Sequence, residues 1–214
     1  MKVLLFGASG NIGLAIAQEL LSRGHSVTGV TRRGAIEGLV HERFTAVAGD
    51  ATDPATVADL AVSHDAVASA VGPKVGRESD RDTIVGATEA LIAGLREAGV
   101  TRLVTIGGAG SLEAAPGRRV IDDPDFPQLW RANAEAQIEA LGLYREVDDL
   151  EWTFISPAAH IGPGERTGVF RIGGDQLLTD SAGKSEITYA DYAVAFVDEL
   201  GRNTAIRRRI TVAY

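Results

Sequence analysis

The sequence predicts an α/β fold, a doubly wound parallel sheet (Rossmann-type) with helices on both faces and a small C-terminal α+β appendage. Three observations support this prediction. Short apolar runs alternate with amphipathic helical patterns along most of the chain. The first apolar run ends in a glycine-rich turn that opens directly into a helical pattern. The chain has 214 residues, 45% of them hydrophobic, which suffices for one sizeable core, so we expect a single domain over residues 1–214.

Composition narrows the classes of function. Asp and Glu number 29 against 21 Lys and Arg, a formal net charge of −8, which argues against nucleic-acid binding. The lack of cysteine excludes disulfides, thiolate nucleophiles and Cys-ligated metals. His25, His41 and His64 do not recur at metal-ligand spacing, so no metal site is expected. No apolar run approaches the ~20 residues of a membrane span. Because no signal-peptide pattern is found either, we expect a cytoplasmic protein without membrane contact.

A glycine turn follows the apolar run Val3–Phe6, and a helical pattern over Leu14–Leu21 follows the turn. Glycines at such a place let the chain turn sharply, let backbone approach an anion, and let the helix pack on the strand. The spacing is G-x-x-G-x-x-G, whereas the usual dinucleotide fingerprint is G-x-G-x-x-G. We predict that backbone N–H groups here hold a pyrophosphate, the alternative being a plain strand-to-helix turn. The residues assigned to this role are Gly7, Ser9, Gly10, Asn11, Ile12 and Gly13.

The second strand, expected over His25–Thr31, ends in a basic pair. Sites that prefer NAD carry an Asp or Glu here, about 20 residues after the glycines, to bind the ribose 2′-hydroxyl. In this chain Thr31 stands in that place, and Arg32 and Arg33 follow. Two guanidinium groups can pair with a 2′-phosphate, so we predict that NADP(H) is preferred over NAD(H). The alternative is a solvated basic turn.

The chain continues to alternate between strands and helices. Further strands are expected over Phe44–Ala48, Asp65–Val71, Thr101–Ile106 and Glu151–Ile155, and helices over Asp80–Ala98, over Gln128–Val147 and from Pro54 behind the N-cap Asp53. This alternation predicts right-handed crossovers and the strand order 3-2-1-4-5-6.

Ligands of such sheets bind at the carboxyl ends of the strands, so residues there are assigned to the cofactor. Asp50 can accept a hydrogen bond from the adenine amino group, although turn formation explains it nearly as well. Residues after the fourth, fifth and sixth strands are expected to shape the nicotinamide pocket. Together with the adenine-side residues after the third strand, the residues assigned to the cofactor at these strand ends are Asp50, Ala51, Val71, Gly72, Gly107 and Pro157.

The remaining segments are expected around the ligand or behind it. Leu112–Gln128, rich in Pro, Asp and Gly, is expected to be a loop long enough to serve as a substrate lid. Residues 157–188 are expected to form a small substrate-side region, in which Phe170–Thr188 resembles a hairpin. A helix over Thr188–Leu200 and a strand over Ile206–Val212 follow.

With these motifs the chain resembles the atypical short-chain dehydrogenases/reductases that carry an NAD(P)H-binding (NmrA-like) domain, and most of all their NADH-flavin reductase subgroup. Many families share the glycine turn, whereas later segments are more discriminating. These are Leu150–Ala159 (LEWTFISPAA), Gly173–Leu178 (GGDQLL) and Ile187–Ala193 (ITYADYA). The similarity covers essentially the whole chain and implies an oxidoreductase that uses NAD(P)H.

A more distant resemblance is to the reductase that acts on biliverdin and flavin. Pro157–Gly162 is similar to its Pro-x-His-Ile-Gly stretch with one extra residue, which implies that His160 faces the nicotinamide as a catalytic candidate. The alternative for His160 is a hydrogen-bonded loop histidine. That relative also has a serine just after the fifth strand, where this chain has Gly108, with Ser111 three residues later. Ser111 is kept as a catalytic candidate, although a turn or cap role is favoured.

The chain departs from the Tyr-x-x-x-Lys pair of short-chain dehydrogenases. Trp130 and Ala134 stand where the pair is expected, and neither can exchange a proton with a substrate. Tyr144 lies far down the same helix and lacks a lysine four residues on. Ordinary alcohol or ketone chemistry is therefore not expected. Flavin reduction does not need the pair, because the site has only to stack and orient two rings.

Three further features are assigned structural roles. Trp130 is expected to be a core residue, the alternative being that it stacks a flat substrate. Asp122, Asp123 and Asp125 are expected to form a solvated loop rather than a magnesium site. Asp191 is expected to cap or brace the last helix.

We therefore expect an NADPH-dependent reductase of a small planar electron acceptor of the flavin or quinone type, acting as a monomer or homodimer. Two alternatives stay open. One is a non-catalytic, NADP-binding redox sensor, which the missing Tyr-Lys pair fits equally well. The other is a sugar-nucleotide epimerase, ranked last because it needs the absent tyrosine and a larger substrate domain.

Overall fold

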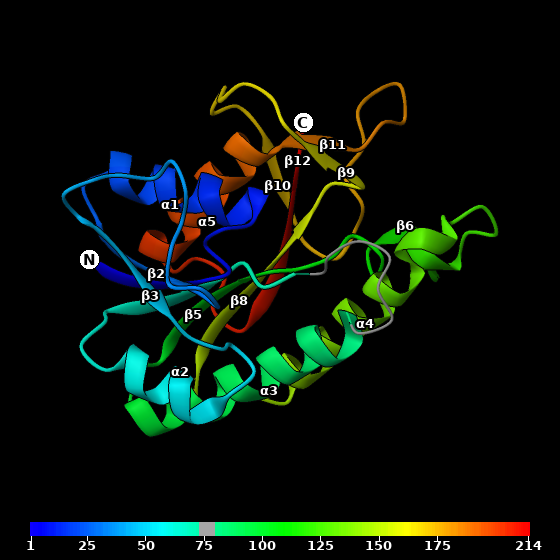
Figure 1. Cartoon of the computed structure of the whole chain (residues 1–214). Coiled ribbons are helices and arrows are strands. Elements are labelled where there is room, and N and C mark those ends of the chain that lie inside the picture. Colours follow the sequence, from blue (N-terminus) through cyan, green and yellow to red (C-terminus); the bar gives the residue numbers. More distant parts are fainter. Residues whose placement is uncertain (73–79) are drawn as a thin grey trace.

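An eight-stranded sheet forms the centre of the computed structural model, which describes residues 1–72 and 80–214 (Figure 1). Its strands are β1 (Lys2–Phe6), β2 (Ser26–Thr31), β3 (Phe44–Ala48), β4 (Ala66–Ser69), β5 (Arg102–Ile106), β8 (Glu151–Pro157), β10 (Arg171–Gly173) and β12 (Arg208–Ala213). They lie in the order β10-β12-β8-β5-β4-β1-β2-β3. Neighbouring strands are parallel except at the edge, where β10 runs antiparallel to β12.

Helices cover both faces of the sheet (Figure 1). The helices α1 (Asn11–Ser22) and α5 (Tyr189–Arg202) pack on one face, and α2 (Pro54–Ala61), α3 (Asp80–Ala98) and α4 (Gln128–Arg145) on the other. β1 shows why its sequence is a continuous apolar run. Val3 and Leu5 face the first pair of helices, whereas Leu4 and Phe6 face the other three. A strand buried on both faces has no polar side.

The predicted strand order is confirmed, with β8 as the sixth strand of the expected 3-2-1-4-5-6 sheet. The C-terminal part extends this sheet. β12 is parallel to β8, with Ile210 paired to Ile155, and α5 packs beside α1. Two strands of the C-terminal part lie outside the main sheet: β9 (His160–Gly162) and β11 (Glu186–Thr188) pair with each other as a separate parallel sheet.

The hairpin expected over Phe170–Thr188 is wrong. Its two strands pair with different partners: β10 pairs with β12, and β11 pairs with β9. A turn is present at Gly183, because its N–H donates to the carbonyl oxygen of Asp180 at 3.0 Å. Strands of three residues have too little pattern to specify a partner, so the sequence shows the turn without showing the pairing.

The prediction that Leu112–Gln128 is a loop without secondary structure is also wrong, whereas its role as a substrate lid stays a prediction. The segment contains a small antiparallel sheet of β6 (Glu113–Ala115) and β7 (Arg118–Arg119), followed by a 3₁₀ turn over Val120–Asp122. Buried Leu112 and Ile121 anchor it to the core. Two acids pair with its arginines, Asp122 with Arg119 and Asp123 with Arg118, and the Arg119 guanidinium lowers the pKa of Asp122 to about 2. The acidic cluster is therefore part of a braced surface turn.

Candidate functional site

The parallel register brings the predicted cofactor residues to one edge of the sheet. Phe6, the last residue of β1, lies level with Val30 of β2 and Ser69 of β4, and Ile106 of β5 lies level with Ile155 of β8. Each strand therefore delivers its following residues to the same side. Along this edge the order is Asp50 and Ala51, Arg32 and Arg33, the glycine turn, Val71 and Gly72, Gly107, and Pro157.

Two of the three turn glycines are required by packing. Gly7 has φ +75°, and a Cβ there would lie 2.5 Å from the carbonyl oxygen of Ala70. A Cβ on Gly13 would lie 2.1 Å from the carbonyl oxygen of Gly7. Gly7 therefore allows the left-handed turn and the approach of β4, and Gly13 lets α1 start against the turn. Neither glycine by itself indicates a ligand.

Gly10 is different, because packing does not require it. Its φ is −78°, and a Cβ there would meet only the carbonyl oxygen of Gly7, at an ordinary 3.5 Å. Gly10 is the N-cap of α1, yet it offers no capping side chain. The backbone N–H groups of Asn11, Ile12 and Gly13 donate to no acceptor in the described part of the chain. The turn thus presents free donors and open space together, the arrangement that binds an anion.

Arg32 and Arg33 are the central residues of a tight turn. The N–H of Gly34 donates to the carbonyl oxygen of Thr31 at 3.2 Å, and Gly34 has φ +68°. Both arginines are exposed and form no hydrogen bond or ion pair with any described residue. The hydroxyl of Thr31 is occupied, because it donates to the carbonyl oxygen of Ala35. Two exposed guanidinium groups without a partner among the described residues therefore follow β2, the strand next to β1 and its glycine turn. An Asp or Glu side chain at this place would repel the 2′-phosphate of NADP(H).

Asp50 forms a local turn at the end of β3. One of its carboxylate oxygens accepts hydrogen bonds from the backbone N–H and the hydroxyl of Thr52, at 2.9 and 2.8 Å. The other oxygen has no partner among the described residues, so the adenine role stays a prediction. Asp53 caps α2 as expected, because its carboxylate accepts from the N–H groups of Ala55 and Thr56.

The residues assigned to the nicotinamide pocket differ in what fixes them. A Cβ on Gly107 would lie 2.1 Å from the ring of Phe154, so core packing alone requires this glycine. Among the described residues, a Cβ on Gly72 would approach the side chain of Ile106 alone, at 3.4 Å. Pro157 is buried as the last residue of β8 and pairs with Val212. Among these, Gly72 has the most open surroundings.

The two catalytic candidates have different surroundings. His160 lies on β9 rather than on a loop; its side chain is exposed, and its imidazole forms no hydrogen bond with the described residues. Ser111 is engaged: its hydroxyl accepts a hydrogen bond from Arg209 of β12 at 2.7 Å, and Arg209 also pairs with Asp175. Ser111 therefore ties the turn after β5 to the last strand. No pattern in the sequence indicates a role for Arg209, whose side chain is only 4% exposed.

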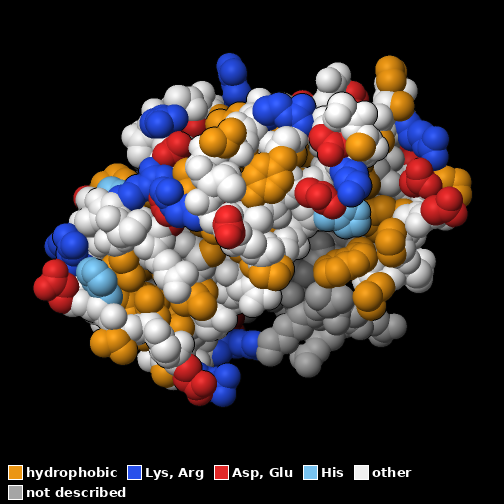
Figure 2. All heavy atoms as spheres, turned by 90° about the horizontal axis from the view of Figure 1, so that it is seen from above, with side chains coloured by type: hydrophobic (Ala, Val, Ile, Leu, Met, Phe, Trp, Pro, Cys, Tyr) orange, Lys and Arg blue, Asp and Glu red, His pale blue; other side chains and the backbone are white. Residues whose placement is uncertain are grey.

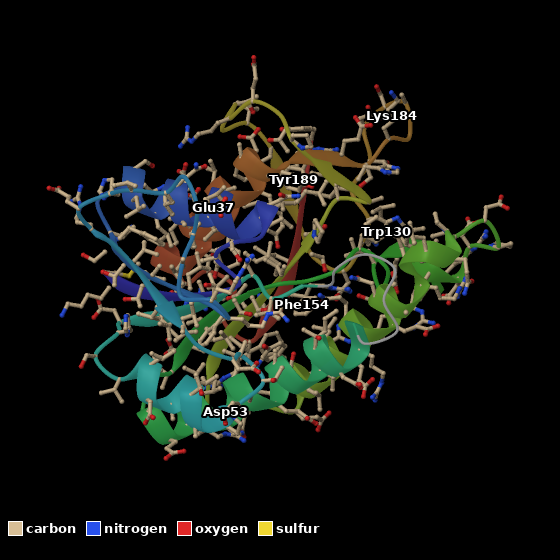
Figure 3. The ribbon with its side chains drawn as sticks, in the orientation of Figure 1. Glu37, Asp53, Trp130, Phe154, Lys184 and Tyr189 are labelled. Atoms are coloured by element: carbon tan, nitrogen blue, oxygen red, sulfur yellow. The ribbon has the colours of Figure 1, made fainter. Side chains whose placement is uncertain are left out.

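The α4 helix holds one tyrosine, and its place in the fold can be compared with the predicted nicotinamide site. Tyr144 is fully buried against Trp152 and Phe154 in the core, and burial raises its pKa to about 12. Trp130, in contrast, is 43% exposed at the other end of the helix, so the prediction of a core residue was wrong. Figure 3 shows Trp130 near the start of α4, far along the helix from the core of the sheet.

Asp191 braces the last helix, as expected, but through a loop rather than a cap. Thr188 is the N-cap of α5, and its hydroxyl accepts from the N–H of Asp191. The buried Asp191 carboxylate accepts from the N–H groups of Thr167 and Gly168 and from the hydroxyl of Tyr214. Burial alone would raise the pKa of Asp191, but these hydrogen bonds outweigh it and hold the pKa below its ordinary value.

A family model described as NAD(P)H-binding matches residues 7–202, from the glycine turn to the end of α5. The chain belongs to this NAD(P)H-binding family. The protein YwnB of Bacillus subtilis (strain 168) is 39% identical over 215 residues, which cover 99% of this chain and 98% of that protein. The family membership agrees with the open anion site at the start of α1.

Solved structures of similar sequence share the whole fold. A candidate NADH-flavin reductase from Streptococcus pneumoniae TIGR4 is 33% identical with a TM-score of 0.86, covering 100% of this chain and 99% of that one. A candidate epimerase from Bacteroides thetaiotaomicron is 34% identical with a TM-score of 0.91, covering 100% and 96%. A candidate exported protein from Burkholderia pseudomallei is 46% identical with a TM-score of 0.90, covering 100% of both chains. In the described part of this chain, no helix has the length and apolar character to cross a membrane.

Proposed function

We propose that the protein is an NADPH-dependent oxidoreductase that reduces a small planar acceptor of the flavin or quinone class. The observation that carries this proposal is the start of α1. There the N–H groups of Asn11, Ile12 and Gly13 are free, and Gly10 lacks a side chain that packing would allow. A diphosphate is the ligand that suits such donors.

Different residues along the sheet edge bind different parts of the cofactor. The glycine turn binds the diphosphate, Arg32 and Arg33 bind the 2′-phosphate, and Asp50 contacts the adenine. Gly72 and the turn after β5 leave room for the nicotinamide. When bound, a reduced nicotinamide supplies a hydride; the acceptor also needs a proton, which water provides.

The preference for NADPH rests on charge. Two unpaired guanidinium groups next to the glycine turn favour an additional phosphate, and Thr31 places no carboxylate there to hold a ribose hydroxyl. NADH would lose these contacts while keeping those to the diphosphate. The proposal therefore places cofactor choice in a four-residue turn.

The acceptor class rests on what the site lacks. Of the described residues on α4, none supplies an accessible tyrosine: Tyr144 is buried, and burial raises its pKa to about 12. Carbonyl reduction and sugar epimerisation both need such a proton donor. A flavin or quinone only has to be stacked and oriented against the nicotinamide.

The experiment measures NADPH oxidation by its absorbance, with FMN, FAD, riboflavin and small quinones as acceptors. We expect turnover with at least one acceptor and weaker turnover when NADH replaces NADPH. Tight NADPH binding with no turnover for any acceptor would refute the reductase and favour the sensor. A cytoplasmic location and a monomeric or homodimeric state remain predictions, the latter testable by light scattering.

A further inference from the structure

Trp130 is a large aromatic residue left uncovered at the start of α4. It is 43% exposed, whereas Trp152, the other tryptophan of the chain, is 3% exposed. Within the described residues, its indole forms no ring contact, no cation–π contact and no hydrogen bond. Single exposed hydrophobic residues are ordinary on a protein surface, so the position of Trp130, and not its exposure alone, has to support a role.

Helix geometry places this ring beside the turn that follows β5. Ala134 and Gln137 face that turn: a Cβ on Gly110 would lie 2.7 Å from the Cβ of Ala134, and one on Gly108 would lie 3.0 Å from that of Gln137. Residues four apart lie on one helix face. Trp130 is therefore on the same face of α4 as Ala134 but one helical turn closer to the N-terminus of the helix, beyond Gly110.

This position is at the rim of the carboxyl edge. α4 connects β5 to β8 in a parallel crossover, so it starts at the edge where those strands end. Figure 3 shows Trp130 between the first turns of α4 and the small sheet that contains β9. In Figure 2, hydrophobic side chains are exposed on the right of the upper face, the side on which α4 begins in Figure 1.

We propose that the Trp130 indole is the platform on which the planar acceptor stacks. This inference rests on the proposed function and names the residue that selects the acceptor. Helical spacing from Ala134, which packs against Gly110, puts Trp130 on the side of α4 that faces the turn after β5 and the predicted nicotinamide pocket. A flat aromatic acceptor covers both the indole and the nicotinamide, whereas a compact acceptor gains nothing from the indole. Trp130 thus favours planar over non-planar acceptors.

The first test is a binding measurement that needs no turnover. FMN is titrated into the protein with and without saturating NADP⁺, and tryptophan emission is followed after inner-filter correction. Because Trp152 is buried, quenching of the exposed Trp130 by a stacked ring reports binding directly. We expect saturable quenching in the native protein and none in Trp130→Leu. Saturable quenching that survives in Trp130→Leu would overturn the proposal.

The second test separates KM from kcat. Trp130→Leu should raise the KM for FMN and for a naphthoquinone by about fivefold to tenfold, with kcat changed less, because stacking energy is lost. Trp130→Phe should recover most of the affinity. The affinity for NADPH, measured by calorimetry, should stay unchanged in both variants, because the ring stacks on the acceptor and not on the cofactor. Leu129→Ala is the matched control, since its side chain is also exposed on the first turn of α4.

The outcomes distinguish the two proposals. If NADPH binds and acceptors are reduced, yet Trp130→Leu leaves the KM of every planar acceptor unchanged, the stacking role is wrong and the proposed function stands. If NADPH does not bind, the proposed function is wrong, and FMN quenching still decides whether Trp130 holds a flat ring. A loss of NADPH affinity as large as the rise in the KM for FMN would show that the substitution damaged the site rather than a platform.

Discussion

At the residue scale, Gly10 separates packing from binding within one motif. Gly7 and Gly13 are sterically obligatory, whereas Gly10 has room for a side chain. We predict that Gly10→Ser leaves the free energy of unfolding unchanged or raises it by up to about 1 kcal/mol, because serine is a good N-cap. The same serine should weaken NADPH binding by roughly tenfold or more, since its hydroxyl competes for the N–H donors. Urea unfolding and calorimetry measure the two effects.

The control for Gly10→Ser is Gly13→Ala, whose Cβ would lie 2.1 Å from backbone. That variant should lose stability and binding together. If Gly10→Ser binds NADPH as tightly as the native protein does, no phosphate sits at Gly10.

The arginine pair makes a second prediction about single residues. Arg32→Ala and Arg33→Ala should each weaken NADPH binding, the more important one by roughly tenfold to a hundredfold, and leave NADH binding within about twofold. Arg43→Ala is the charge-matched control. It lies in the same connection but at the opposite edge, next to the first residue of β3, where it donates to Gly24. Equal losses for NADPH and NADH would show that the arginines do not read the 2′-phosphate.

The substitution Ser111→Ala tests whether the hydroxyl of Ser111 takes part in the reaction. Its oxygen accepts from Arg209, which spans the turn after β5 and the last strand. We predict that Ser111→Ala lowers the free energy of unfolding by about 1 kcal/mol and changes turnover less than about twofold. A kcat loss of a hundredfold, with stability retained, would restore Ser111 as a proton donor.

At the element scale, the link between α5 and the loop 163–168 depends on one carboxylate. Asp191 is fully buried and accepts four hydrogen bonds, from two backbone N–H groups and the hydroxyls of Thr167 and Tyr214. Asp191→Asn should lower the free energy of unfolding at neutral pH by about 2 kcal/mol, because bonds to a charged acceptor are lost. Denaturant unfolding measures this.

The pH dependence of this contribution has a defined sign. The folded pKa of Asp191 lies below its ordinary value, so the stabilisation is complete above the unfolded pKa of ~3.9 and is lost as pH falls through the folded pKa. Asp191→Asn should therefore flatten the stability profile below about pH 4. Glu19, whose pKa the Arg166 guanidinium lowers, retains its own acid sensitivity and serves as the internal comparison. An unchanged acid limb would contradict the assignment.

Sequence patterns predicted elements well where the signal is local. The bounds Phe44–Ala48 and Asp80–Ala98 match β3 and α3, and Asp53 caps α2, because strand alternation, glycine stops and caps are read over a few residues. The pairing of β10 with β12 was missed, because residues 174–207 separate strands that are only three and six residues long. Trp130 was misjudged for a related reason. Periodicity assigns Trp130 to the same face of α4 as Ala134. Only the fold shows that the turn after β5, which packs on this face, reaches Ala134 through Gly110.

At the scale of the whole molecule, the proposed function makes the edge of the sheet one linear site. Six strand ends would present the proposed diphosphate, 2′-phosphate and acceptor positions in one row, so cofactor binding should stabilise the entire fold. We predict that NADPH at about a hundred times its Kd adds roughly 2.7 kcal/mol to the free energy of unfolding and raises Tm by roughly 5–10 °C. Adenosine alone, which lacks the diphosphate, should raise Tm far less. If adenosine raised Tm as much as NADPH does, the glycine turn and its diphosphate would not be the main source of the binding free energy.

The claim on which all the others depend is that free backbone donors at the start of α1 hold the diphosphate of NADP(H). A calorimetric titration of the native protein with NADPH, and then with NADH, tests it most directly. We expect saturable binding with one cofactor per chain, tighter for NADPH. If saturating NADPH gives neither heat nor any change in Tm, the α1 site does not bind a dinucleotide.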